Sequence, residues 1–227
     1  MKLLDIYESL KPERDMFEGF NELELSEEYP EGFDLNEFKN LRSYAKKMSY
    51  ARAYLGKPLG TGSSRVVYRV DETKVLKLAK NEKGIHQNEA EINFYGDSYY
   101  EDIIAKVIDF DDQNGYWTEM ELAFKAKPDD FKRLWDIKFN DLYFYLERRY
   151  QENIGRKPTW GIDVKVKEQL DNSDDVAHLV SFMFDSTTLP SDLCKINSWG
   201  IVKREYGDAL VLIDFGFTSE VYESYYK

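Results

Sequence analysis

The order of strand and helix patterns between residues 59 and 122 constrains the fold of this chain more than any other feature. Four segments are rich in β-branched or alternating apolar residues, as expected of strands. The first two flank the polar turn DETK, and the last two flank DDQNG, in which Asn-Gly tolerates positive φ. Between the two pairs, Ile85–Tyr95 has the pattern of a helix, so we expect a small antiparallel sheet with one inserted helix. The predicted strands are Val66–Val70, Lys74–Ala79, Ile103–Phe110 and Tyr116–Leu122.

Apolar residues at helical spacing predict helices on both sides of this segment. On the N-terminal side, Asp34 and Glu37 resemble a capping box, and the apolar positions from Phe38 to Leu55 predict one helix of about five turns, packed on the next segment of the chain. On the C-terminal side, helices are predicted from Pro128, over FNDLYFYLERRYQ and over SDDVAHLVSFMF, with GRKPTWG as a break. Two short strands, GIVKRE and ALVLID, come near the end of the chain.

The composition is that of a folded protein without disulfide or zinc cross-links. Of the 227 residues, 42% are apolar and 15% aromatic, which is enough for one substantial core or two small lobes. Cys194 is the only cysteine in the sequence, so no internal disulfide can form, and this fits a reducing cytosol. With only His86 and His178, the chain cannot assemble a zinc site from cysteine and histidine ligands.

The charge of the chain argues against nucleic acid as a partner. Acidic residues outnumber basic ones by 43 to 31, which gives a net charge of −12. Such a surface repels phosphate backbones, and it fits simple solubility as well as a preference for basic partners. No apolar run approaches membrane-spanning length, and the N-terminus turns polar too soon for a signal peptide. These features predict a soluble, intracellular protein.

The segment LPSDLCKINSWGIVKREYGDALVLIDFG carries the strongest chemical signal. Asp192 precedes Asn197 by five positions, and a short hairpin then brings Asp214 behind an apolar strand. A loop and a hairpin in this order can hold three oxygen-bearing side chains around a pair of cations. Magnesium demands near-octahedral oxygen ligands, so the arrangement suits a magnesium site.

Two features near the first hairpin are weaker signals. Gly60-Thr61-Gly62 would let the backbone approach a phosphate, although a G-x-G alone is more often a plain turn. Lys77 lies in an otherwise apolar strand, where a lysine usually faces solvent. The next helix offers Glu89 or Glu91 as a carboxylate partner, and a lysine held in this way can serve as a fixed clamp on nucleotide phosphates.

Together these motifs resemble the protein-kinase-like superfamily. The resemblance covers about Leu59 to Phe217 and is weak between residues 124 and 173. It implies an α+β, two-lobed fold with a small antiparallel sheet in the N-lobe and a reduced, mostly helical C-lobe that ends soon after Asp-Phe-Gly. The implied domains are an N-terminal helical extension packed on the fold over 1–56, the N-lobe over 57–123 and the C-lobe over 124–227.

The resemblance also implies roles for individual residues. Gly60 and Gly62 match the glycine-rich loop, and Lys77 matches the phosphate-clamping lysine, with Glu91 as its expected helix partner and Glu89 as the fallback. The remaining matches belong to the nucleotide hinge, the catalytic loop and the metal site. They are Met120 as gatekeeper, Glu121 to Ala123 as backbone partners of adenine, Asp192 as catalytic base, and Asn197 and Asp214 as magnesium ligands.

The sequence departs from the family pattern at three places. Arg65 replaces the third loop glycine, which should stiffen the loop and add a charge near the phosphates. Pro190-Ser191 stands where the family has His-Arg, and Cys194 stands where many members have a lysine, with Lys195 one position later. The helical platform on which protein kinases dock peptides is not expected in so short a chain.

The resemblance implies an ATP- and magnesium-dependent phosphotransferase, most simply one that phosphorylates protein hydroxyls of the Ser/Thr type. Two alternatives stay open. One is a pseudokinase-like binding protein that captures a host or viral protein without catalysis. The other is an enzyme that uses a small-molecule acceptor or transfers a nucleotidyl group. Small truncated kinase-like proteins of this kind are similar to ones encoded by bacteriophages and prophages, which implies the cytoplasm of a host cell as location. The sequence does not indicate an oligomeric state.

Overall fold

The larger sheet of the molecule has five antiparallel strands. The computed structural model describes residues 29–158 and 161–226, so residues 1–28 of the predicted N-terminal extension lie outside the described residues. Both predicted hairpins are present, because β2 pairs with β3 and β4 pairs with β5. The strands lie in the order β1-β2-β3-β5-β4 and are β1 Gly60–Thr61, β2 Arg65–Arg69, β3 Lys74–Ala79, β4 Val107–Phe110 and β5 Trp117–Glu121.

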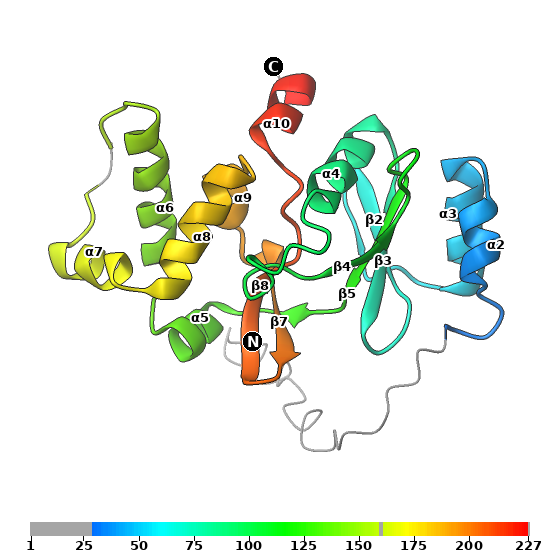
Figure 1. Cartoon of the computed structure of the whole chain (residues 1–227), viewed down its shortest axis with the longest axis horizontal. Coiled ribbons are helices and arrows are strands. Elements are labelled where there is room, and N and C mark those ends of the chain that lie inside the picture. Colours follow the sequence, from blue (N-terminus) through cyan, green and yellow to red (C-terminus); the bar gives the residue numbers. More distant parts are fainter. Residues whose placement is uncertain (1–28, 159–160, 227) are drawn as a thin grey trace, which may run out of the picture.

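Strand β3 places alternate side chains on opposite faces of this sheet. Leu76 packs in a buried cluster with residues of helices α2, Leu35–Asn40, and α3, Tyr44–Tyr54. Lys77 lies on the other face and contacts helix α4, Glu82–Ile92. Figure 1 shows α2 and α3 on one side of the sheet and α4 on the other. Helices α2 and α3 therefore cover the face of the sheet opposite α4.

The prediction of one continuous helix over residues 34–55 is wrong, because the chain breaks between α2 and α3. The buried ammonium group of Lys47 donates to the carbonyl oxygens of Phe38 and Lys39 at 2.9 and 2.8 Å. These bonds satisfy carbonyls that a continuous helix would use internally. Ser43 then caps α3 with its hydroxyl.

The predicted capping box at the start of α2 is completed by Tyr50, which bridges Asp34 and Glu37. The Asp34 carboxylate accepts the backbone N–H of Glu37 at 2.9 Å. The N–H of Asp34 donates to the hydroxyl of Tyr50, which donates in turn to the Glu37 carboxylate, each at 3.1 Å. Tyr50 lies on α3, so the cap also holds the two helices together.

The strand predicted from Ile103 begins only at Val107. The N–H of Ala105 donates to the carbonyl of Leu212 at 2.9 Å, and the N–H of Leu212 donates to the carbonyl of Ile103 at 2.8 Å. Residues 103–105 are thus bound to the end of β8 and join the large sheet to a second, three-stranded sheet. Its strands, in spatial order, are β6 Phe124–Lys125, β7 Trp199–Arg204 and β8 Gly207–Leu212.

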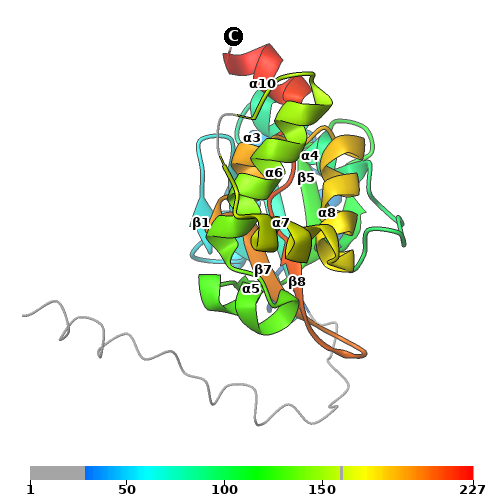
Figure 2. The same ribbon diagram turned by 90° about the vertical axis from the view of Figure 1, so that its left-hand side faces the viewer.

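The rest of the described chain is mostly helical, as predicted. Three predicted helices are present as α5, α6 and α8, and Figure 2 shows α6, α7 and α8 side by side in front of the sheets. Helix α7 was not predicted; it begins after Asp163, whose carboxylate accepts the N–H of Lys165 at 2.9 Å. Residues 159 and 160 of the predicted break lie outside the described residues. The helices are α5 Pro128–Trp135, α6 Phe139–Asn153, α7 Val164–Asp171, α8 Asp174–Asp185, α9 Pro190–Leu193 and α10 Ser219–Tyr226, with the 3₁₀ turn η2 Ile196–Ser198.

One buried apolar cluster connects the two sheets with the helices. Val75 and Met120 of the large sheet share it with Phe182 of α8 and Leu212 of β8. The described helices include none with the length and apolar character needed to cross a membrane.

Candidate active site

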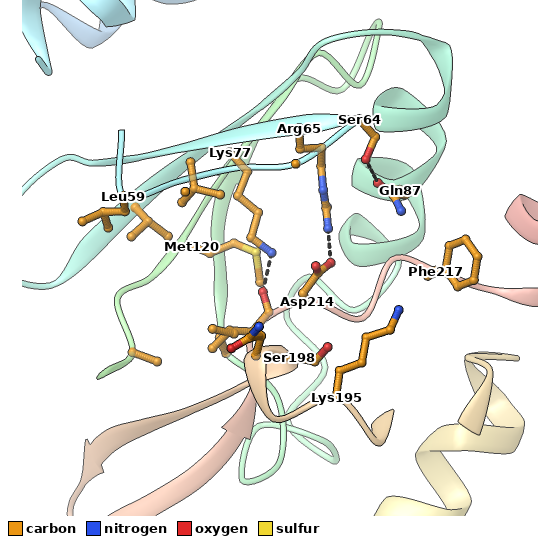
Figure 3. A pocket seen from close by; sticks show the side chains of 18 of the residues that line it. Leu59, Ser64, Arg65, Lys77, Gln87, Met120, Lys195, Ser198, Asp214 and Phe217 are labelled. Atoms are coloured by element: carbon orange, nitrogen blue, oxygen red, sulfur yellow. Dashed lines mark hydrogen bonds and ion pairs between the residues drawn. The ribbon is translucent and has the colours of Figure 1, made fainter. Parts of the chain in front are cut away.

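A cavity of about 850 Å³ lies where the large sheet faces α9, η2 and the end of β8. Figure 3 shows its lining, with Lys77, Arg65, Asp214 and Lys195 converging on one region. All but one of the predicted site residues line this cavity. They are Gly60, Gly62, Lys77, Met120, Glu121, Ala123, Asp192, Asn197 and Asp214. The exception is Glu91, which lies fully buried on α4.

Lys77 and Glu91 form a buried ion pair between β3 and α4. The Lys77 ammonium donates to the two Glu91 carboxylate oxygens at 3.0 and 2.9 Å, and to the carbonyl oxygen of Ile213 at 2.6 Å. Glu89 is not the partner, because two positions along a helix turn a side chain to nearly the opposite face. Its carboxylate lies 3.0 Å from His86 and is half-exposed. Of the two candidates left open by the sequence, the structure brings Glu91 to Lys77.

Burial and the neighbouring charges together set the pKa of the Lys77 ammonium group. Desolvation lowers the pKa of its ammonium group, and the nearby Arg65 lowers it further, while the Glu91 carboxylate opposes both. The hydrogen bonds to two carboxylate oxygens and a carbonyl use all three ammonium donors. Lys77 is therefore held in one position at the wall of the cavity.

Asp214 lies two positions after the end of strand β8 and points into the cavity, where its side chain is 55% exposed. The guanidinium of Arg65 forms an ion pair with one of its carboxylate oxygens. Desolvation raises the pKa of Asp214, but the charges of Arg65, Lys77 and Lys195 outweigh it and hold the pKa below its usual range. The Asp214 carboxylate is thus kept ionised, as a metal ligand must be.

Arg65 makes ion pairs that the sequence pattern did not predict. Its guanidinium also lies 2.8 Å from Glu91 and donates to the Asn88 side chain at 3.3 Å, and only 6% of the residue is exposed. The sequence predicts a charge near the phosphates, and the structure places the Arg65 guanidinium in the cavity lining, paired with Glu91 and Asp214. A signal was available, because Arg65 and Val67 alternate along β2 and Val67 lies opposite Lys77 in the sheet.

Asp192 lies on the short helix α9 and lines the cavity together with Lys195. Pro190 occupies the first position of this helix, where its missing N–H costs no hydrogen bond. Burial raises the pKa of the Asp192 carboxyl, and an ion pair with Lys195 opposes that rise. Trp199 anchors the segment by donating its indole N–H to the carbonyl of Leu193 at 2.7 Å.

The donor set of the cavity suits magnesium only in company with phosphate. Asn197 lies exposed on η2 at the cavity wall, so its amide oxygen and the Asp214 carboxylate are the two expected protein ligands. Within the described residues, no group of three or more His, Cys, Asp or Glu side chains could hold a metal by itself. Magnesium commonly takes one or two protein oxygens and completes its shell with substrate phosphates and water. The residues present fit that pattern.

The opposite end of the cavity is apolar and suits a flat, aromatic ligand. Glu121 and Ala123 border this end, and the Glu121 carboxylate is held by an ion pair with Arg204. The apolar side chains that line it come from six separate segments of the chain. They are Leu59, Val67, Val75, Ala105, Met120, Leu122 and Ile213.

Comparison with known proteins finds similarity among solved structures. No protein-family model matches the sequence, and no curated protein matches it. Fifteen chains of solved structures match, among them the GDP and kanamycin complex of APH(2")-IIia, an aminoglycoside phosphotransferase. That match has a TM-score of 0.31 and 11% sequence identity, and it covers 71% of this chain and 66% of that chain.

Proposed function

We propose that the chain is a phosphotransferase with a protein-kinase-like, two-lobed fold that uses ATP and magnesium. The observation that carries the proposal is the buried Lys77–Glu91 pair, whose ammonium group lies in the same cavity as Asp214 and Asp192. A fixed cation beside an ionised carboxylate and an apolar recess has the parts needed for a nucleotide polyphosphate and its base. The domain limits 57–123 and 124–227 belong to this proposal.

Each residue has a role in this mechanism. Lys77, held by Glu91, places its positive charge beside the phosphates, and the apolar end of the cavity receives the adenine beside Glu121 and Ala123. Asn197 and Asp214 would hold magnesium, which when bound neutralises charge that develops on the transferred phosphoryl group. Asp192 orients the acceptor hydroxyl and takes its proton. Its raised pKa supports this role, because a better base accepts a proton more readily.

The acceptor that we propose is a hydroxyl group of a protein, in the cytoplasm. Nothing in the cavity lining selects against a small-molecule acceptor, and transfer of a nucleotidyl group would use the same phosphate-binding residues. Incubation with ATP labelled at either the α- or the γ-phosphate separates these reactions. We expect γ-label on an acceptor protein and no α-label transfer.

A second candidate function rests on one contact. Arg65 is ion-paired with Asp214, the expected magnesium ligand, and such a contact could disable catalysis in a pseudokinase-like binding protein. That protein would bind its partner through the same scaffold, with or without nucleotide. The intact set of Lys77, Asp192, Asn197 and Asp214 favours the enzyme.

The two functions are separated by comparing Asp192→Asn with Asp214→Asn. Asp192→Asn should retain the thermal stabilisation by Mg-ATP, about 2.7 kcal/mol at a hundredfold excess over Kd, and should lose turnover by roughly 10²–10⁴. Asp214→Asn should lose both. Asp129→Asn, an exposed position on α5, is the control for removal of one negative charge. If the wild type shows neither thermal stabilisation by Mg-ATP nor transfer of label, the phosphotransferase proposal is wrong and the binding-protein proposal is favoured.

A further inference from the structure

Arg65 brings a second permanent cation to the carboxylate that already binds Lys77. Both side chains contact Glu91, at 2.8 Å from the guanidinium and 2.9 Å from the ammonium group. A guanidinium stays protonated in proteins at every working pH. Arg65 is therefore a permanent charge in a place where the family pattern has a glycine and no charge.

The charged side chains around Asp214 and Asp192 are paired with one another before any metal binds. Lys77 and Arg65 face Glu91 and Asp214, while Lys195 is paired with Asp192. One oxygen of Asp214 is already engaged by Arg65. The carboxylate can still offer its other oxygen to a cation, since the side chain is half-exposed to the cavity, but it cannot bind two metal ions through separate oxygens.

The Arg65 guanidinium also has N–H donors that its contacts within the protein do not use. It carries five N–H groups in a planar fork, a geometry that matches phosphate oxygens. Its contacts to Glu91, Asn88 and Asp214 involve its two terminal nitrogens, and the residue lines the cavity. A polyphosphate bound beside Lys77 would therefore lie within reach of a second, preorganised cation.

We propose that Arg65 is a built-in cation of the polyphosphate site and takes the place of one of the two metal ions that a kinase-like site would use. This inference rests on the proposed function and deepens it. The site binds a nucleoside triphosphate with one divalent metal ion, held by Asp214 and Asn197, and retains part of its affinity when no metal is present. Lys77 and Arg65 supply that metal-independent part.

The test measures binding of a fluorescent ATP analogue in EDTA and in excess Mg²⁺, together with the number of Mn²⁺ ions bound at saturating nucleotide. The variants are Arg65→Gln, which removes the charge, and Arg65→Lys, which keeps the charge without the fork. Arg69→Gln is the matched control, because Arg69 lies on the same strand, is exposed and pairs with Glu72 outside the cavity. Melting of each protein without ligand reports whether it is folded.

We expect the wild type to bind the analogue in EDTA and to bind one Mn²⁺ per nucleotide site. Arg65→Gln should weaken binding in EDTA by about 10- to 100-fold, the effect of losing one or two charge-assisted hydrogen bonds, and should change binding in Mg²⁺ less. Arg65→Lys should lie between, and Arg69→Gln should match the wild type. If neither Arg65 variant folds, the inference is tested on the wild type alone, by its affinity for the analogue in EDTA and by the number of Mn²⁺ ions bound per site.

Three results would overturn the inference. The first is a wild type that binds two Mn²⁺ ions or binds nucleotide only with metal. The second is equal binding in EDTA by a folded Arg65→Gln variant. The third is tighter Mg-nucleotide binding by Arg65→Gln, which would make Arg65 a latch on Asp214. In these three cases the proposed function stands, whereas no nucleotide binding in either buffer overturns both.

Discussion

The backbone of Gly216 lies directly against that of Gln87 on helix α4. A Cβ atom on Gly216 would be 2.9 Å from the carbonyl carbon of Gln87 and 3.0 Å from its Cα. A second close approach lies near the start of α4, where a Cβ on Gly84 would be 3.1 Å from the carbonyl carbon of Ser64. These two contacts set how closely α4 packs against its neighbours. Glu91 lies on the same helix, so we expect these contacts to help hold it against Lys77.

Gly216→Ala should loosen the contact between α4 and the segment after β8. The added methyl group meets backbone atoms, which cannot rotate away, so we expect a loss of about 1–3 kcal/mol in the free energy of unfolding. Nucleotide binding should weaken as well, because the Lys77–Glu91 pair shifts. Gly161→Ala is the control, since a Cβ there meets nothing within 4 Å. Equal melting temperatures for the two variants would show that α4 is not held in this way.

Glu91→Gln should be far more damaging than Glu89→Gln. The Glu91 carboxylate is fully buried and neutralises both Lys77 and Arg65, so its loss leaves buried cations uncompensated. We expect a cost of about 3–5 kcal/mol in the free energy of unfolding, measured by denaturant titration. Glu89 is 52% exposed and pairs only with His86 among the ion pairs of the described residues. Its substitution should cost less than about 1 kcal/mol, and a similar cost for both would contradict the assignment.

Phe38→Ala tests whether the N-terminal extension is part of the fold. The Phe38 ring is fully buried and contacts Trp117 of β5 edge to face, with ring centroids 5.7 Å apart. Removal of such a ring should cost about 3–5 kcal/mol of unfolding free energy. Tyr44 lies on the same extension but is 44% exposed, and Tyr44→Ala should cost much less. A Phe38→Ala protein that melts like the wild type would mean that the extension packs only loosely.

The sequence, through its resemblance to the kinase-like pattern, predicted the parts of the site that depend on the order and spacing of residues in neighbouring segments of the chain. The distance from Lys77 to Glu91 and the order of Asp192, Asn197 and Asp214 are features of this kind. The structure brings all five residues to the cavity or its wall. The hairpins were also predicted, because their turns and strands are adjacent in the sequence.

The features that were missed depend on contacts between distant residues. Arg65 and Asp214 lie 149 positions apart, so no local pattern indicates their ion pair. The break before α3 depends on Lys47 reaching back to the end of α2. Residues 103–105 lose their strand pairing because the end of β8 binds them instead. In each case a tertiary contact outweighs a local preference.

The pH dependence of turnover tests Asp192 as the base, and Lys195 as the residue that tunes it. Burial raises the pKa of Asp192, and Lys195 lowers it again through their ion pair. A base works only when ionised, so kcat/KM should fall as pH drops through this raised pKa. Lys195→Gln removes the opposing charge, and we expect the acid limb of the profile to move to higher pH. The quantity to compare is the pH at which kcat/KM falls, because the maximal value of kcat/KM also reflects any contact of Lys195 with phosphate.

Lys132→Gln is the control. Lys132 forms an exposed ion pair with Asp136 at the end of α5, so this substitution should not change the pH of the acid limb. A limb that stays fixed or moves to lower pH in Lys195→Gln would show that another group is the base.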